Sequence, residues 1–178
     1  MAAPRPLPLD PIDEAHRQWT AHGWGEVADG MAAVTSLVRA QQIVMARVDE
    51  ALRPSGLTFS RYELLMLLSF SRTGALPMTV ASARLQVHPT SVTNTVDRLE
   101  AARLVERVPH PTDRRATLIA ITDAGRELAT STTEELNKRV FAEPGLPPDR
   151  LRQLLRLLAE FRHAAGDFEA GDITDRWS

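Results

Sequence analysis

The stretch from His88 to Arg115 combines small hydrogen-bonding side chains with arginines. A helix is expected to start at Pro89, because proline has no N–H to leave unpaired in a first turn. Apolar residues then recur at helical spacing and mark a buried face. At about 100° per residue, hydroxyl and amide groups fall on or beside the opposite face. These residues are Thr90, Ser91, Thr93 and Asn94. Such groups can read base edges in a major groove, although an ordinary surface helix with a polar first turn fits the same pattern.

The segment after this helix has the pattern of a β-hairpin with a charged tip. Two β-branched runs, residues 105–108 and 117–121, flank a turn-rich loop. The loop carries Asp113, Arg114 and Arg115. An arginine at a hairpin tip can enter a minor groove, and Asp113, two residues before Arg115, can hold its guanidinium in place. A solvated charged turn is the alternative, but the position directly after a polar-faced helix favours nucleic-acid contact.

The residues before the helix complete a helix-turn-helix pattern. Ser60 and Glu63 have the spacing of a capping box at the start of one helix, which Gly74 ends. A short helix capped by Thr79 follows, and residues 86–88 form the turn into the polar-faced helix. In this arrangement the first helix braces the second, and both Arg84 and Arg98 can neutralise phosphates.

Long apolar patterns flank this region on both sides. Residues 24–52 predict a helix whose apolar arc is wide for one small core, so part of it is expected to contact a second chain. A long core helix in a monomer is the alternative. A helix capped by Thr122 is expected to reach about Val140, and Asp149 is expected to cap a last helix. The apolar seam of that helix is Leu151, Leu154, Leu155, Leu158 and Phe161.

Composition restricts the classes of function. The chain has no cysteine, which excludes disulfides, a thiolate metal site and a thiol redox switch. The net charge is −2, but residues 84–115 hold six arginines against four acidic residues, a local charge of +2. This segregation permits nucleic-acid binding without demanding it. No apolar run approaches a membrane span, and the N-terminus lacks the apolar segment of a signal peptide, so a cytoplasmic location without a membrane partner is expected.

No pattern of catalytic residues is present. There is no Gly-rich phosphate loop, no zinc-protease helix and no dinucleotide fingerprint, so neither a cofactor nor an enzymatic activity is expected. His16 and His22 are not four residues apart, as a helical metal pair would be, and no metal site is expected.

The chain resembles the MarR family of winged helix-turn-helix regulators over roughly residues 25 to 165. The resemblance lies in Val92-Thr93, Val96-Asp97-Arg98-Leu99-Glu100, Leu104-Val105-Glu106-Arg107, Asp113-Arg114-Arg115 and Ile121-Thr122-Asp123-Ala124-Gly125. It implies that residues 89–101 form the recognition helix and that Asp113 and Arg115 are the wing pair. One departure is Arg103, where the family usually has the glycine that supplies a left-handed helix end.

The expected fold is therefore mainly α with a small β-hairpin wing, a winged helix-turn-helix lobe joined to a helical dimerisation region. A tail at residues 1–11 precedes a single domain at 12–178. Within it, residues of about 12–53 and 122–165 are expected to dimerise, and about 57–121 to form the winged lobe. Residues 166–178 are polar, and the sequence does not define their structure.

The expected function is that of a sequence-specific regulator of transcription, a homodimeric repressor on a pseudo-palindromic double-stranded DNA operator. The resemblance also implies release by a small aromatic or lipophilic effector, for which the candidate contacts are Trp24, Tyr62 and Met66. A winged-helix protein that acts through protein contacts or non-specific DNA binding is the alternative. The sequence names neither the operator nor the effector, and it does not separate repression from activation.

Overall fold

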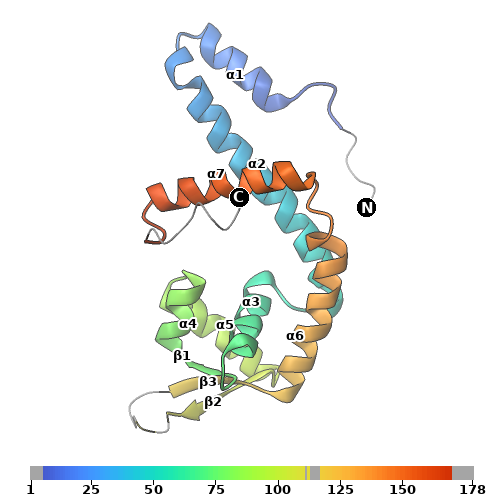
Figure 1. The fold of residues 1–178 in the computed structure, drawn as a ribbon, viewed down its shortest axis with the longest axis vertical. Coiled ribbons are helices and arrows are strands. Elements are labelled where there is room, and N and C mark those ends of the chain that lie inside the picture. The colour runs from blue at the N-terminus through green and yellow to red at the C-terminus, as the bar shows by residue number, and fades with distance from the viewer. Residues whose placement is uncertain (1–5, 111, 113–116, 170–178) are drawn as a thin grey trace. The chain divides into compact units, whose positions relative to one another are not determined.

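The computed structural model describes residues 6–110, 112 and 117–169. The chain divides into two compact units, residues 1–59 and residues 60–178, which are considered one at a time (Figure 1).

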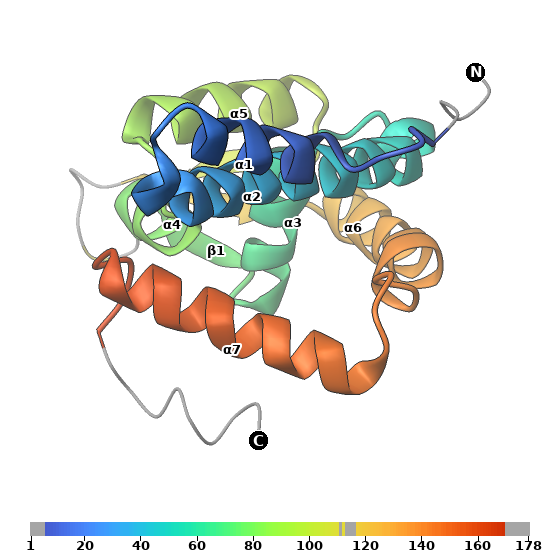
Figure 2. The same cartoon turned by 90° about the horizontal axis from the view of Figure 1, so that it is seen from above.

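The N-terminal unit is a helical hairpin. It contains α1 (Pro11–Ala21), α2 (Gly25–Leu52) and a 3-10 turn, η1 (Arg53–Ser55). The carboxylate of Asp10 caps α1 by accepting the N–H of Ile12 at 2.9 Å. Both views show α1 folded back along α2 (Figures 1 and 2), and His16 Nε2 lies 2.8 Å from Asp29 Oδ1 across the hairpin. The expected long helix at 24–52 is confirmed to within one residue.

The long helix α2 leaves much apolar surface exposed in the single chain. Val34 is 63% exposed and Val27 60%. The other exposed members of the predicted arc are Leu37, Val38, Ile43 and Val44. Exposed apolar surface of this extent is characteristic of a face that contacts another chain.

The second unit holds the remaining elements. They are α3 (Phe59–Phe70), β1 (Ala75–Pro77), α4 (Met78–Leu85), α5 (Pro89–Ala101), β2 (Val105–Pro109), β3 (Thr117–Ile121), α6 (Asp123–Leu136), the π-helical turn η2 (Asn137–Phe141) and α7 (Pro148–Ala164). This is the expected fold class, mainly helical with a small antiparallel sheet.

The sheet has the strand order β1-β3-β2, and both pairings are antiparallel. Arg107 of β2 pairs with Ile119 of β3, and Ala75 of β1 pairs with Ala120 on the other edge. Strand β1 was not predicted from the sequence. With three residues, one of them a proline that lacks a ladder donor, it is too short to show an alternating pattern.

Three predicted helix caps are wrong, because each helix begins one residue before the predicted cap. Ser60 lies inside α3, because the helix already begins at Phe59, directly after Thr58, itself a residue type favoured at N-caps. Thr79 and Asp149 lie in the first turns of α4 and α7, which begin after Pro77 and Pro147. In both cases extended backbone at a proline sets the start of the helix instead of a side-chain cap. Thr122 is confirmed as the cap of α6, with its Oγ1 accepting the N–H of Gly125 at 3.0 Å.

The start of α6 lies against the loop that leaves α5. The carbonyl oxygen of Leu104 accepts the N–H of Thr122 at 3.1 Å, and the hydroxyl of Thr122 donates to the carbonyl of Arg103 at 2.9 Å. A Cβ atom on Gly125 would overlap the Leu104 carbonyl oxygen and come within 3.0 Å of the side chain of Ile121. Position 125 therefore requires glycine, because only a residue without a side chain leaves room for the carbonyl of Leu104.

We predict that Gly125→Ala lowers the free energy of unfolding by roughly 1–3 kcal/mol, because the methyl group must displace backbone and not a flexible side chain. Urea titration of the purified protein measures this change. Gly30→Ala is the control, since Gly30 lies in α2 with no atom within 4 Å of the added methyl group and should gain helix propensity. Equal stability of Gly125→Ala and the wild type would contradict the close approach.

Candidate nucleic-acid interface

The turn between α4 and α5 has a defined geometry. Gln86 has φ of 53°, and its N–H donates to Ala83 O at 3.3 Å, while the N–H of Val87 reaches back to Ser82 O at 3.3 Å. The hydroxyl of the buried Ser82 also donates to the carbonyl of Val87 at 2.7 Å. These bonds stop α4 and reverse the chain within three residues, as the helix-turn-helix prediction required.

The N-terminus of α5 is capped by a histidine. His88 Nδ1 accepts the N–H of Thr90 at 3.3 Å, and the carbonyl of His88 accepts the N–H of Ser91 at 2.9 Å. Pro89 occupies the first helical position, as predicted.

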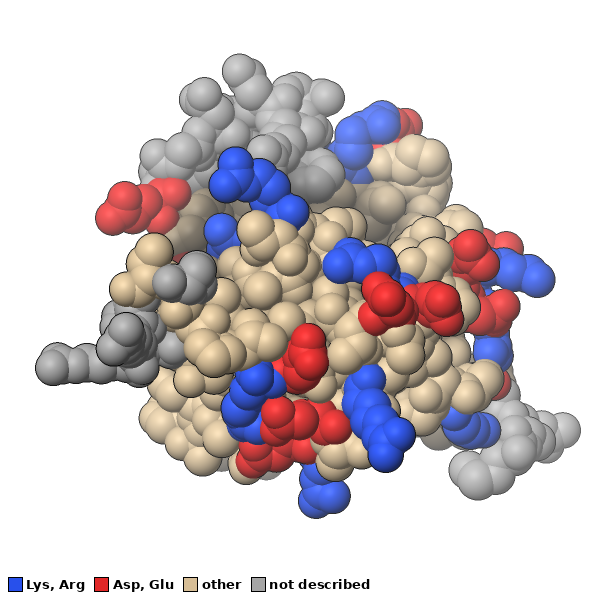
Figure 3. Space-filling view, turned by 90° about the horizontal axis from the view of Figure 1, so that it is seen from below, with Lys and Arg blue, Asp and Glu red and all other residues tan. Residues whose placement is uncertain are grey.

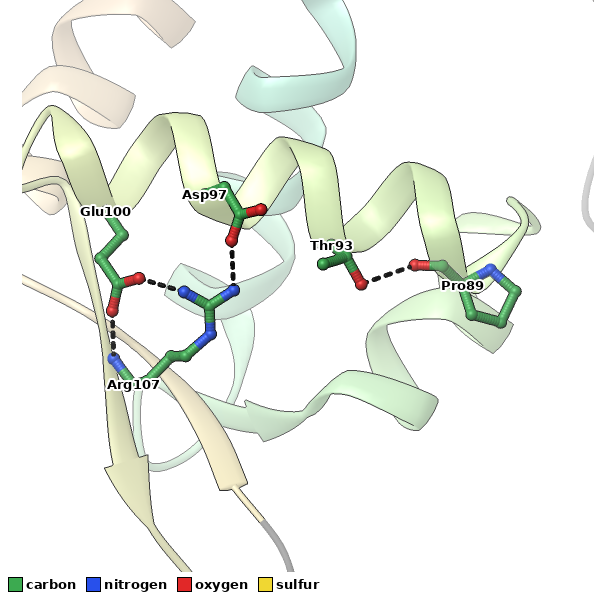
Figure 4. A network of polar contacts seen from close by, with 5 residues as sticks. All are labelled: Pro89, Thr93, Asp97, Glu100 and Arg107. Atoms are coloured by element: carbon green, nitrogen blue, oxygen red, sulfur yellow. Dashed lines mark hydrogen bonds and ion pairs between the residues drawn. The ribbon is translucent and has the colours of Figure 1, made fainter.

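The orientation of α5 is set by its buried face. Val92, Val96 and Leu99 are at most 2% exposed. The four predicted base-reading residues are all exposed; they are Thr90, Ser91, Thr93 and Asn94. The Thr93 hydroxyl donates to Pro89 O at 3.1 Å (Figure 4), so it presents its oxygen to a ligand mainly as an acceptor. The structure thus places all four side chains where a groove could receive them, while their contacts with DNA stay a prediction.

The predicted phosphate ligands that the structure describes are also exposed. Arg84 lies in the last turn of α4 and Arg98 in the last turn of α5. The wing residues Asp113, Arg114 and Arg115 lie outside the described residues. On the face drawn in Figure 3, the basic and acidic side chains of the described residues are interspersed.

The chain leaves α5 through a left-handed residue. Arg103 has φ of 59°, its N–H donates to Glu100 O at 2.8 Å, and the N–H of Leu104 donates to Leu99 O at 2.9 Å. This pair of bonds is a Schellman motif, which usually has glycine at the left-handed position. Arg103 thus adopts the geometry expected of the family's glycine, at a cost of about 1 kcal/mol.

An arginine of the first wing strand forms a contact that the sequence did not reveal. Arg107 of β2 donates from Nη2 to Asp97 Oδ1 at 2.5 Å and from Nη1 to Glu100 Oε2, and both acceptors belong to α5 (Figure 4). Its backbone N–H also donates to Glu100 Oε1 at 3.2 Å. The hydrogen bond to Asp97, with the charge of Glu100, raises the pKa of Arg107 above its usual value. The only sequence signal was the acidic pair at i and i+3 on a helix followed by a strand arginine.

Two of the three candidate effector contacts meet at one hydroxyl group. Thr133 Oγ1 of α6 lies 3.0 Å from the hydroxyl of Tyr62 and 3.2 Å from Met66 Sδ, both on α3. Tyr62 is buried and Met66 half-buried. Trp24 belongs to the N-terminal unit, where it is 54% exposed and its ring centroid lies 5.4 Å from that of Trp19.

Across residues 6–110, 112 and 117–169, no three His, Cys, Asp or Glu side chains are arranged to hold a metal ion. In the same ranges, no helix is both long and apolar enough to cross a membrane.

A bracing helix, a three-residue turn, a helix with an exposed polar face and a β-hairpin together define a winged helix-turn-helix lobe. Comparison with known proteins agrees with this geometry. A family model described as MarR family matches residues 55–116. The HTH-type transcriptional regulator YdgJ of Bacillus subtilis strain 168 is 30% identical over 118 residues, which cover 65% of this chain and 70% of YdgJ.

Solved structures give the same result. Sco5413, a MarR family transcriptional regulator from Streptomyces coelicolor, is 46% identical with a TM-score of 0.72, and the match covers 80% of this chain and 99% of Sco5413. CouR from Rhodococcus jostii RHA1 bound to p-coumaroyl-CoA is 26% identical with a TM-score of 0.63, covering 76% of this chain and 92% of CouR. CouR bound to a 23-mer DNA duplex gives 26% identity and a TM-score of 0.65, covering 71% and 89%.

The chain belongs to the MarR family. It is a transcriptional regulator with a winged helix-turn-helix DNA-binding lobe, which confirms the resemblance seen in the sequence. The expected class, a regulator and not an enzyme, is confirmed by the same relatives.

We predict that Arg103→Gly raises the free energy of unfolding by about 1 kcal/mol, because glycine adopts the left-handed conformation without a Cβ penalty. Denaturant titration measures the gain. Arg103→Ala is the matched control, since it removes the same side chain but keeps a Cβ at positive φ and should gain nothing. The strain assignment would be wrong if alanine and glycine stabilised the protein equally.

Proposed function

We propose that this protein is a cytoplasmic, homodimeric, sequence-specific repressor that leaves its operator when a small aromatic or lipophilic effector binds. One observation carries the proposal: α5 buries its apolar face and exposes four hydroxyl and amide side chains at its N-terminal end. Side chains of this kind can discriminate bases at close range, whereas a surface used for protein contacts favours aromatic and apolar anchors.

The same helix would read the operator from its N-terminal half. Thr90, Ser91 and Thr93 are short enough to approach base edges, and Asn94 can pair bidentately with adenine. Arg84 and Arg98 would contact phosphates on either side of the groove, and Arg115 would probe the minor groove, held by Asp113 and assisted by Arg114. The structure of CouR bound to a 23-mer DNA duplex supports DNA binding by a protein of this fold.

A homodimer would supply the second recognition helix. Two-fold symmetry would place two copies of α5 about one helical turn apart on a pseudo-palindromic site. The exposed apolar residues of α2 support a dimer, as does the seam of α7, where Phe161 is 62% exposed and Leu154 37%. We retain the proposed division of the chain, with dimerisation helices at about 12–53 and 122–165 and the winged lobe at about 57–121.

The effector would act by binding unequally to the DNA-compatible and DNA-incompatible forms of the dimer. CouR binds p-coumaroyl-CoA, an aromatic thioester, which supports an aromatic ligand class. Tyr62 and Met66 remain the candidate contacts in α3, and Trp24 in the N-terminal unit. Titration of a preformed protein–operator complex with aromatic acids and their coenzyme A thioesters tests this step, and a complex that none of them dissociates would contradict it.

We predict that Asn94→Ala weakens operator binding by about tenfold while binding to scrambled duplex hardly changes, because Asn94 would read a base. Arg98→Ala should weaken both equally and reduce the salt slope by about one, because a phosphate contact carries no sequence information. The operator is first selected from random duplexes, and affinity is then measured by fluorescence anisotropy. Glu135→Gln, on an exposed position of α6, is the control. Equal losses on both duplexes with Asn94→Ala would favour the alternative of non-specific DNA binding.

Leu157 is a further exposed apolar residue of α7, at 56%. We predict that the double variant Leu157→Glu/Phe161→Glu is monomeric and loses at least tenfold in operator affinity, because two carboxylates would be buried and unpaired at the interface. Sedimentation velocity reports the oligomeric state. Arg156→Glu is the control, since this neighbouring exposed position is already charged. An intact dimer in the double variant would show that the exposed part of α7 does not form the interface.

A further inference from the structure

Arg107 lies on β2, the first strand of the hairpin that follows the recognition helix. Its guanidinium points back toward α5, with Nη2 on Asp97 and Nη1 on Glu100 (Figure 4). Only 32% of its side chain is exposed, against 54% for Asp97. Both terminal nitrogens of Arg107 are thus engaged within the protein.

The two carboxylates lie where they would oppose DNA binding. Asp97 follows Thr93 by four residues and Asn94 by three, so it shares their side of α5. Glu100 lies in the last turn, where a carboxylate also interacts unfavourably with the partial negative charge of the helix C-terminus. Within a Debye length of about 10 Å, unpaired carboxylates on this face would repel the phosphates that the neighbouring arginines attract.

The contact also joins α5 and β2, whose relative position would affect how the lobe reads a base sequence. Arg107 is on β2, in register with Ile119 of β3, while both acceptors are on α5. The planar guanidinium binds both carboxylates, and the backbone N–H of Arg107 binds the same carboxylate as Nη1, that of Glu100. Together these bonds fix both the distance and the relative orientation of α5 and β2. The recognition helix is therefore held to the first wing strand at its C-terminal half, next to the proposed base-reading residues.

We propose that Arg107 is a positioning residue that acts through Asp97 and Glu100: it offsets one of the two carboxylate charges on the DNA-facing side of α5 and fixes that helix to the wing, without binding phosphate itself. The proposal rests on the proposed reading role of α5. It implies that Asp97 and Glu100 are tolerated on this face only because Arg107 is present.

A mutant cycle separates this role from a phosphate contact. Operator affinity is measured at several salt concentrations for Arg107→Gln, for Asp97→Asn/Glu100→Gln and for the triple variant. Arg107→Gln should lose about tenfold in the wild-type background, because two carboxylates become unpaired. In the Asp97→Asn/Glu100→Gln background the same substitution should change affinity less than about twofold, because nothing is left to neutralise.

Arg98→Gln is the matched control, since a direct phosphate ligand should lose the same factor in both backgrounds and reduce the salt slope by about one in each. If Arg107→Gln behaved like Arg98→Gln, the proposal would be overturned. Circular dichroism melting shows whether each variant is folded. If Arg107→Gln unfolds, Arg107→Lys replaces it, keeping one charge but losing the two-carboxylate geometry, with a smaller loss expected in the same pattern. Wild-type protein that bound no duplex would overturn the proposed function. If the wild type binds normally and Arg107→Gln loses the same factor of affinity in both backgrounds, this inference alone is overturned.

Discussion

The position of the recognition helix depends on a close approach between backbone segments at its exit. The carbonyl of Leu104 accepts the N–H of Thr122, and the first turn of α6 lies so near that position 125 has no room for a side chain. The Thr122 hydroxyl bonds to both segments, because it accepts the N–H of Gly125 in α6 and donates to the carbonyl of Arg103 after α5. The end of α5 and the start of α6 are thus held through hydrogen bonds and van der Waals exclusion, which do not depend on surface charge.

The charges of the winged lobe are organised through individual ion pairs and individual exposed arginines. A chain with net charge −2 cannot rely on a general basic surface to attract DNA. Two acidic residues of α5 are bound by one arginine of β2, while the arginines at the ends of α4 and α5 remain exposed. Each ion pair on an exposed surface contributes little to stability. The larger effect of such an ion pair is to determine which charges at the protein surface remain uncompensated.

The sequence predicted the elements with strong periodicity and local signals. Helix α5 begins at Pro89 and α6 is capped by Thr122, both as expected. The sequence marks Arg103 as a departure from the family's glycine without fixing its conformation, and the structure shows that Arg103 is left-handed. These features depend on residues within one turn of each other. Strand β1 was missed because its three residues gain their structure from pairing with β3, some 40 positions later in the chain. The Arg107 contact was missed for a similar reason, since only the fold brings Asp97 and Arg107 together.

The contacts that Thr122 and Gly125 make between the exit of α5 and the start of α6 determine which segment can be exchanged between regulators of this fold. A recognition helix transplanted alone would meet a foreign carbonyl at position 104 and a foreign strand residue at position 107. A chimera that carries residues 75–126 as a block keeps the sheet, both helices of the reading motif and the first turn of α6 with their own partners. The segment that keeps all these contacts together is therefore about fifty residues long, several times the length of α5.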